Sequence, residues 1–118
     1  MANLKDLLRD LVQVEGITTA VVVGRDGFVI DGITNAGQMD IEAVGAVVST
    51  GIGSSEVMGR ELNVGKMTQG LVEYDSGIIT VSFLGKDAIL AVVADLNSNL
   101  GNVRYQVKKR TPEIQAAL

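Results

Sequence analysis

The side chains that carry out most enzyme chemistry are scarce in this sequence. Its 118 residues include neither histidine nor cysteine. The missing cysteines exclude disulfides, thiolate metal sites and a cysteine nucleophile. The missing histidines remove the usual general base near neutral pH and the commonest metal ligand. The composition therefore argues against most conventional catalytic mechanisms.

The remaining carboxylates and hydroxyls add little further chemistry. Three aspartates lie in expected hairpin turns. Aspartate is common there because its carboxylate accepts a hydrogen bond from a nearby backbone amide, so these residues need no catalytic role. They are Asp26, Asp75 and Asp87. Asp95 ends an apolar stretch, and its carboxylate is expected to cap the loop that follows. The serines lack an obvious base, which leaves a Ser-Lys pairing as the open enzymatic alternative. We expect no catalytic residue, no bound metal and no cofactor.

Two glycine-containing segments match phosphate-binding loops only in part. Gly51-Ile-Gly-Ser-Ser-Glu lacks the third glycine of a dinucleotide loop, and it lies inside an expected helix. Gly65-Lys66 matches the end of a phosphate-binding loop, but Arg60 stands where that motif needs a glycine. Met67 stands where the motif needs a hydroxyl residue. Neither segment predicts a nucleotide site.

The net charge of −4 argues against a general nucleic-acid binder, because such proteins display a basic face. Charge is uneven along the chain. Residues 1–97 hold 6 basic and 13 acidic side chains, whereas residues 98–118 hold 4 basic and 1 acidic. We interpret the basic segment from Arg104 to Arg110 as a solvated helix face. Docking to an acidic partner or to a membrane surface is the alternative.

The sequence shows no signal for export or for membrane insertion. Near the N-terminus, charged residues alternate with leucine, unlike the apolar core of a signal peptide. The longest uncharged stretch, Ala43 to Ser55, is shorter than the about 20 apolar residues of a membrane span. We expect one domain over residues 1–118, located in the cytoplasm.

The elements that would position these residues begin and end with helices. Apolar residues recur at three- and four-residue spacing from Leu4 to Val12, with Asn3 as the N-cap and Gly16 as the C-terminal stop. A second amphipathic pattern follows residue 97. Pro112 lies inside it and is expected to kink or restart the helix, with Thr111 as the new N-cap.

A β-hairpin is expected directly after the first helix. Its strands are Ile17 to Gly24 and a return that begins at Phe28 and closes near Gly32. The turn is Arg25-Asp26-Gly27. An Asp-Gly pair between β-branched runs is the strongest short hairpin signal, because glycine tolerates a positive φ.

One long helix is expected from Ile41 to Leu62, with Asp40 as the N-cap. Four glycines inside it each cost about 1 kcal/mol relative to alanine, so close approach of another backbone must compensate. Because the helix lacks charge for more than three turns, it must be covered on more than one face. Its apolar stripe is Ile41, Val44, Val48, Ile52, Met58 and Leu62, and its small-residue stripe is Ala46, Ser49, Thr50, Gly53 and Val57.

Three further strands form a meander. They run from Met67 to Tyr74, from Ile78 to Leu84 and from Ala88 to Asp95, with glycine-containing turns between them. Polar residues in the first of these strands predict an edge position. The third is almost wholly apolar, which predicts a central strand covered on both faces.

The order of these elements and three local signatures resemble the roadblock (dynein light chain) family. The signatures cover nearly the whole chain. They are the leucine-rich helix followed by Ile17-Thr-Thr-Ala-Val-Val-Val-Gly-Arg-Asp-Gly-Phe-Val-Ile, the small-residue helix from Ile41 to Leu62, and Ala88-Ile-Leu-Ala-Val-Val-Ala-Asp through Asn99-Leu-Gly-Asn-Val-Arg. The resemblance implies an α+β, roadblock/profilin-like fold in the order α-β-β-α-β-β-β-α. Its five-stranded antiparallel sheet lies between one long helix and the two terminal helices.

The resemblance also implies a homodimer, in which the third strands pair and the second helices pack together. It implies a small Ras-like GTPase as partner, with the bacterial gliding-motility GTPase activator as a functional counterpart. The expected dimer-interface residues are Ala46, Ser49, Thr50, Gly53, Val57, Met67, Gln69, Leu71 and Glu73. The expected partner-binding residues are Glu42, Ser49, Glu56 and Arg60.

Two other functions stay open. The first is a purely structural scaffold subunit, which would bind its complex without any effect on nucleotide turnover; the sequence does not separate it from a GTPase regulator. A small-ligand sensory domain would need a pocket lined by polar groups. The meander is too uniformly aliphatic to predict such a pocket, which disfavours the sensory function.

Overall fold

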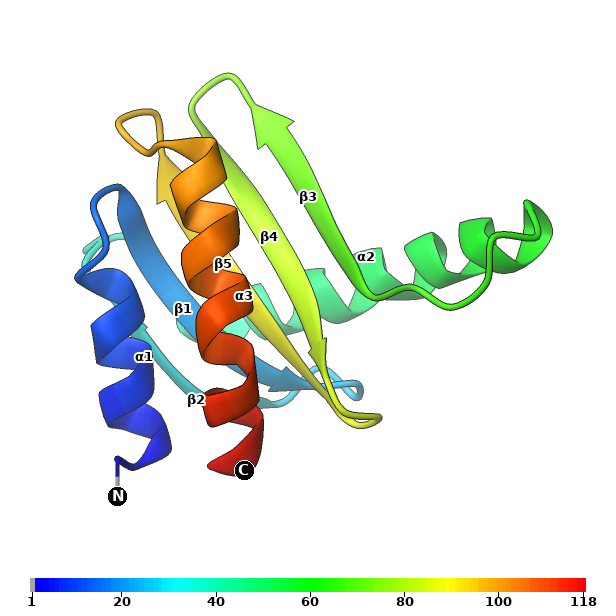
Figure 1. Cartoon of the computed structure of the whole chain (residues 1–118), viewed down its shortest axis with the longest axis horizontal. Helices are drawn as coiled ribbons and strands as arrows, with labels where there is room; N and C mark the ends of the chain where they lie inside the picture. Colours follow the sequence, from blue (N-terminus) through cyan, green and yellow to red (C-terminus); the bar gives the residue numbers. More distant parts are fainter. Residues whose placement is uncertain (1) are drawn as a thin grey trace.

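A computed structural model describes residues 2–118 of the chain, and it has the expected order of elements (Figure 1). The helices are α1 (Leu4–Val12), α2 (Ile41–Glu61) and α3 (Leu100–Ala116). The strands are β1 (Ile17–Gly24), β2 (Val29–Thr34), β3 (Gln69–Tyr74), β4 (Gly77–Leu84) and β5 (Ala88–Asp95). The α+β prediction is confirmed. Among the described residues, no helix is both long enough and apolar enough to span a membrane.

The strands form one antiparallel sheet in the order β2-β1-β5-β4-β3. Central β5 places Ala91 opposite Val21 of β1 on one side and Val81 of β4 on the other. Six of the eight β5 residues are buried, as expected for an apolar strand covered on both faces. β3 pairs with β4 and ends the sheet, so its predicted edge position is confirmed.

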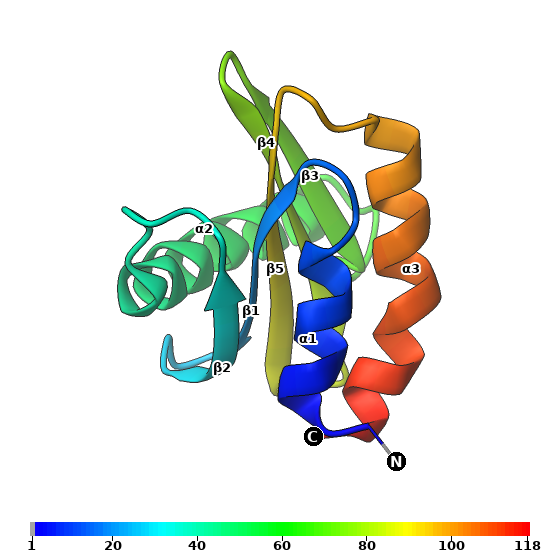
Figure 2. The ribbon, with the colours of Figure 1, turned by 90° about the vertical axis from the view of Figure 1, so that its left-hand side faces the viewer.

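The sheet separates two helical layers. α1 and α3 cover one face, and α2 crosses the other (Figure 2). The larger hydrophobic cluster lies under α1 and α3, and it includes the fully buried side chains Leu8, Leu11, Val103 and Ile114. The cluster under α2 is smaller: its buried members are Val48, Ile52, Ile89 and Ala91.

The predicted helix starts are confirmed by their caps. The Asn3 side chain accepts a hydrogen bond from the Asp6 amide at 2.9 Å, and Asp40 accepts from the amides of Glu42 and Ala43. Such caps satisfy amides that have no partner within the helix. The predicted stop of the first helix is wrong, because α1 ends at Val12. Gly16 instead turns the chain into β1 at a φ of +90°, packed against Ser98.

The largest departure from expectation is in α3. The helix neither restarts nor takes Thr111 as an N-cap, but continues through Pro112 to Ala116. The Thr111 hydroxyl donates a hydrogen bond to the Val107 carbonyl at 2.7 Å, so it bonds back into the preceding turn. Smaller differences concern strand ends. β3 starts at Gln69 rather than at Met67, and β2 continues two residues beyond Gly32.

Candidate functional site

The outer face of α2 carries large apolar side chains that nothing in the described chain covers. Only three of its residues are buried, namely Gly45, Val48 and Ile52. Met58 and Leu62, which belong to the predicted apolar stripe, are 61% and 69% exposed. The reason is that the C-terminal part of α2 extends beyond β3, where the sheet has ended (Figure 1).

Most of the small-residue stripe of α2 also faces outward. Ala46, Thr50, Gly53 and Val57 are exposed, whereas Ser49 is half-buried and its Oγ lies beside Gly27 in the turn between β1 and β2. The structure separates the helix glycines into two kinds. A Cβ on Gly45 would overlap the carbonyl oxygen of Gly27, so this glycine lets the hairpin approach the helix. A Cβ on Gly51 or Gly53 would meet no atom within 4 Å.

The free edge of β3 lies on the same side of the molecule as the overhanging end of α2 (Figure 1). Gln69 and Glu73 are exposed, and Leu71 is half-buried. Met67, which we expected with them at an interface, packs partly against the cluster under α2. An unpaired strand edge presents backbone donors and acceptors that can extend the sheet into another chain.

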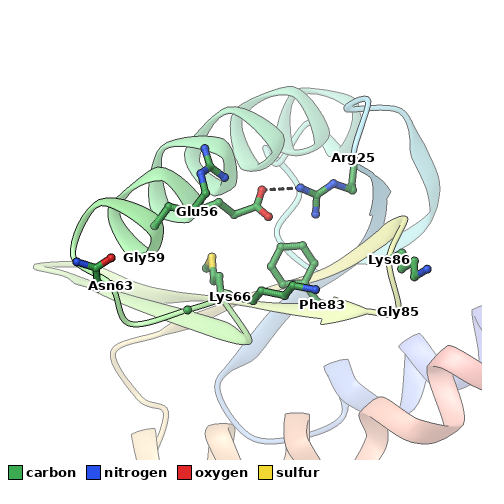
Figure 3. Close-up of a pocket in the computed structure, with 11 residues that line it drawn as sticks. Arg25, Glu56, Gly59, Asn63, Lys66, Phe83, Gly85 and Lys86 are labelled. Carbon is green, nitrogen blue, oxygen red and sulfur yellow. Dashed lines mark hydrogen bonds and ion pairs between the residues drawn. The ribbon is translucent and has the colours of Figure 1, made fainter.

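The expected partner-binding residues of α2 have different surroundings. Glu42 and Arg60 are exposed near the two ends of the helix. Glu56 points to the turn between β1 and β2, where its Oε1 lies 2.5 Å from Nη2 of Arg25 (Figure 3). This hydrogen bond holds the pKa of the Glu56 carboxyl below its usual range and raises the pKa of the Arg25 guanidinium. Glu56 is therefore engaged within the chain.

Arg25 and Glu56 form one wall of a hollow of about 870 Å³ beneath the end of α2 (Figure 3). The guanidinium of Arg25 also lies over the Phe83 ring, 5.2 Å from its centroid, which fixes it by a cation–π contact. Arg60, Lys66 and Lys86 line the hollow as well. The arrangement favours an acidic group of a partner and offers no nucleophile paired with a base.

Sequence reasoning did not find this hollow, because its cations come from four separate segments. The signal present was Gly65-Lys66, which we had tested only as a phosphate-binding loop. In the structure Gly65 has a φ of +92° and closes the turn after α2. Its carbonyl oxygen lies 2.6 Å from where a Cβ on Gly59 would stand, which explains that helix glycine.

Two of the aspartates considered for chemistry hold turns by hydrogen bonds to the backbone. Asp26 accepts a hydrogen bond from the Phe28 amide at 3.1 Å, and Asp95 accepts from the Asn97 amide at 2.9 Å. Both are the expected turn contacts. Across residues 2–118, no group of three or more His, Cys, Asp or Glu side chains is placed to hold a metal ion.

Sequence comparison identifies relatives over almost the whole chain. Residues 3–94 match the family described as Roadblock/LC7 domain. The uncharacterized protein MJ0310 of Methanocaldococcus jannaschii is 34% identical over 110 residues, which cover 93% of this chain and 95% of that protein. MJ0714 of the same organism is 32% identical over 110 residues, with coverage of 93% and 92%.

Solved structures with the same fold include two bacterial proteins. MglB of Myxococcus xanthus aligns with a TM-score of 0.88 over 96% of this chain and 92% of its own, at 15% identity. A Roadblock/LC7 domain from Streptomyces avermitilis aligns with a TM-score of 0.86 over 98% and 97%, at 25% identity. With a family match over most of its length and relatives above 30% identity, the chain belongs to the Roadblock/LC7 domain family.

Proposed function

We propose that the protein is a non-catalytic homodimeric module that binds a small Ras-like GTPase and regulates or positions it. The observation that carries this proposal is the uncovered face of α2 beside the free edge of β3. Family membership supports the coarser function, a regulatory or interaction module. The resemblance of the sequence to prokaryotic roadblock proteins supports the small GTPase as partner, and the gliding protein MglB has the same fold.

A second copy of the chain is the first partner that this surface fits. Antiparallel pairing of β3 with its symmetry mate would satisfy the open backbone edge and extend the sheet. The same arrangement would place the overhanging end of α2 over the partner's sheet. Val57, Met58 and Leu62 would then be covered, and Gly53 would allow the two helices to approach closely.

The GTPase would dock on the ridge formed by the two α2 helices. That ridge has an apolar centre, with Glu42 and Arg60 as a charged rim, which is the usual arrangement at a protein interface. One GTPase lying across the two-fold axis would touch both copies. Regulation would arise because the dimer binds one conformation of the GTPase more tightly and so orders the catalytic groups of that partner.

Gly53→Leu tests the dimer. The leucine has open space in the single chain, so folding is retained, but it collides with the second helix and weakens association at least tenfold. Sedimentation equilibrium measures this, with Gly37→Leu, in open space outside α2, as the matched control. Unchanged association of Gly53→Leu, or a monomeric parent protein at micromolar concentration, would refute the proposed interface.

Ser49→Glu tests the docking ridge, because it places a charge at the border between the ridge and the turn that joins β1 and β2. We expect it to abolish binding of a small Ras-like GTPase that the parent protein binds in a pull-down. Gln115→Glu adds the same charge to exposed α3 and is expected to bind normally. Arg60→Ala, followed by nucleotide turnover, tests a direct catalytic contribution, and we expect stimulation to be retained.

The structural scaffold stays as the competing function, and the same assay decides between the two. A GTPase that binds the parent protein and hydrolyses GTP at an unchanged rate would support the scaffold. Normal binding by Ser49→Glu would exclude the ridge as the docking surface. The basic hollow beside Arg25 and the basic segment of α3 would then be the next surfaces to test.

A further inference from the structure

A second hollow, of about 300 Å³, lies on the opposite face of the sheet from α2. We call it the α3–β4 hollow. It opens along the flank of α3, which covers part of this face and leaves the strands toward β3 less covered (Figures 1 and 2). It is lined by Leu71, Thr80, Ser82, Leu100, Arg104 and Val107, among others. Nothing in the proposed GTPase contact uses these side chains.

Two hydroxyl residues occupy core positions at the base of this hollow. Thr80 and Ser82 of β4 are 5% and 7% exposed, whereas the other buried residues beneath α3 are apolar. Thr80 Oγ1 has no hydrogen-bond partner and almost no accessible surface, so an acceptor in the hollow reaches it only when the side chain rotates toward the hollow. Leaving a buried hydroxyl unpaired destabilises a fold relative to an apolar residue of the same shape. Valine would fit a β-strand equally well, so threonine here calls for an acceptor that comes from outside the chain.

The other residues that line the hollow indicate the chemical class of the molecule that carries this acceptor. Arg104 is exposed on α3 and is one of the residues that line the hollow, so its guanidinium is available to a ligand there. It begins a basic segment whose next cations, Lys108 and Lys109, are also exposed. Leu71, Leu100 and Val107 supply apolar surface. A guanidinium with two hydroxyl donors matches a carboxylate, and the leucines and valine match a short aliphatic chain.

We propose that the α3–β4 hollow binds a small aliphatic carboxylic acid. The carboxylate accepts hydrogen bonds from the hydroxyls of Thr80 and Ser82 and from the Arg104 guanidinium. The hydrocarbon chain lies against Leu71, Leu100 and Val107. Polar residues at a few fixed positions in an otherwise apolar pocket are typical of small-molecule sites. This goes beyond the proposed function and restores the ligand-binding possibility that the aliphatic meander had argued against.

Titration of the full chain with hexanoate, followed by two-dimensional amide NMR, tests the site. We expect saturable shifts in the amides of residues 69–71, 80–82 and 104–107. Thr80→Val, which keeps the shape and removes the donor, is expected to weaken binding about tenfold or more. It is also expected to raise the thermal midpoint of the ligand-free protein, because no unpaired hydroxyl stays buried. Ser82→Ala gives a second route to the same loss of affinity.

Charge is tested by a matched pair on one helix. Arg104→Gln is expected to weaken hexanoate binding about tenfold or more. Lys109→Gln removes the same charge from the part of α3 where the ammonium faces the Tyr105 ring, and it is expected to leave affinity unchanged. Equal losses in both variants would mean general attraction to a basic helix and would overturn the site. So would shifts that do not saturate, or equal affinity in Thr80→Val.

The outcome is separable from that of the proposed function. Ser49→Glu changes the opposite face of the sheet, so it is expected to bind hexanoate as the parent protein does while losing the GTPase. Loss of GTPase binding by Ser49→Glu with normal hexanoate binding would support the α3–β4 hollow as a separate binding site. Normal GTPase binding without saturable hexanoate shifts would overturn the hollow alone.

Discussion

The two faces of the sheet differ in how completely the helices that cover them are buried. Under α1 and α3, the apolar side chains of both helices meet the sheet in one continuous cluster, in which Leu8, Leu11, Val103 and Ile114 lie at 0% exposure. Over the other face, α2 is more than twice as long as α1 but has only three buried residues. Val47 and Met58 remain 70% and 61% exposed there.

The contrast separates stability from binding. Burial of apolar surface is the main favourable contribution to folding, so the α1–α3 face supplies most of the stability of the single chain. Extended apolar surface left in water marks an interaction site. The face that contributes less to folding is therefore the face available for partners, and each of the following changes tests one side of this comparison.

The largest difference is expected between a leucine under α1 and a valine on α2. Leu11→Ala empties a fully buried position and is expected to lower the free energy of unfolding by about 2–5 kcal/mol. Val57→Ala is expected to change it by less than about 0.5 kcal/mol, because the side chain is already 44% exposed. Urea unfolding followed by circular dichroism at low protein concentration gives both values. Equal losses would contradict the division between the faces.

A pair of glycines on α2 sharpens the comparison within one helix. Gly45→Ala forces the helix away from the Gly27 carbonyl and is expected to cost about 1–3 kcal/mol. Gly51→Ala meets no neighbour and is expected to stabilise the chain by up to about 1 kcal/mol through helix propensity. Thermal unfolding of both variants checks the signs. Destabilisation by Gly51→Ala in the monomer would show that this part of α2 is already covered.

Local signals explain why most of the fold was predictable. Each of these signals acts over a few residues. The Asp26-Gly27 pair predicted the hairpin turn, the caps at Asn3 and Asp40 predicted two helix starts, and the apolar run of β5 predicted the central strand. The end of the first helix was harder, because Gly16 serves a contact with Ser98 rather than the helix. A glycine that permits close approach gives the same signal in sequence as one that ends a helix.

The candidate sites were predictable only where they coincide with an edge or an exposed stripe. The β3 edge and the small residues of α2 were found this way. The pairing of Arg25 with Glu56 joins residues 31 positions apart, and its geometry depends on where α2 crosses the sheet. Thr80 and Ser82 read as ordinary strand residues until the position of α3 shows that they line a hollow.

Pro112 tests whether a single residue of α3 lowers the stability of the α1–α3 face. The residue lacks the N–H that would bond to the preceding turn of α3, so Pro112→Ala is expected to stabilise the chain by about 1 kcal/mol. The gain is smaller than the about 3 kcal/mol of a proline deep inside a helix, because few turns follow it. Urea unfolding measures it. A loss of stability would mean that the fixed backbone φ of the exposed proline stabilises this part of α3.

The smallest effect is expected at the contact that ties α2 to the hairpin. The Glu56 carboxyl has a lowered pKa in the folded chain because of its hydrogen bond to Arg25. The folded state therefore favours ionised Glu56, and this stabilisation is present above the ordinary glutamate pKa. It is lost as the pH falls through that value to the lowered one. Acidification should thus loosen the partner-facing helix before it affects the apolar α1–α3 face.

Glu56→Gln isolates this contribution. At neutral pH the variant is expected to unfold at a slightly lower temperature than the parent protein, because a neutral amide binds the Arg25 guanidinium less strongly. The difference should shrink as the pH falls below the ordinary glutamate pKa and through the lowered one, because protonation makes the Glu56 side chain neutral as well. Glu61→Gln removes the same charge from the exposed end of α2 and serves as the matched control. A difference that stays constant with pH, or that Glu61→Gln reproduces, would assign the effect to net charge and not to the bond with Arg25.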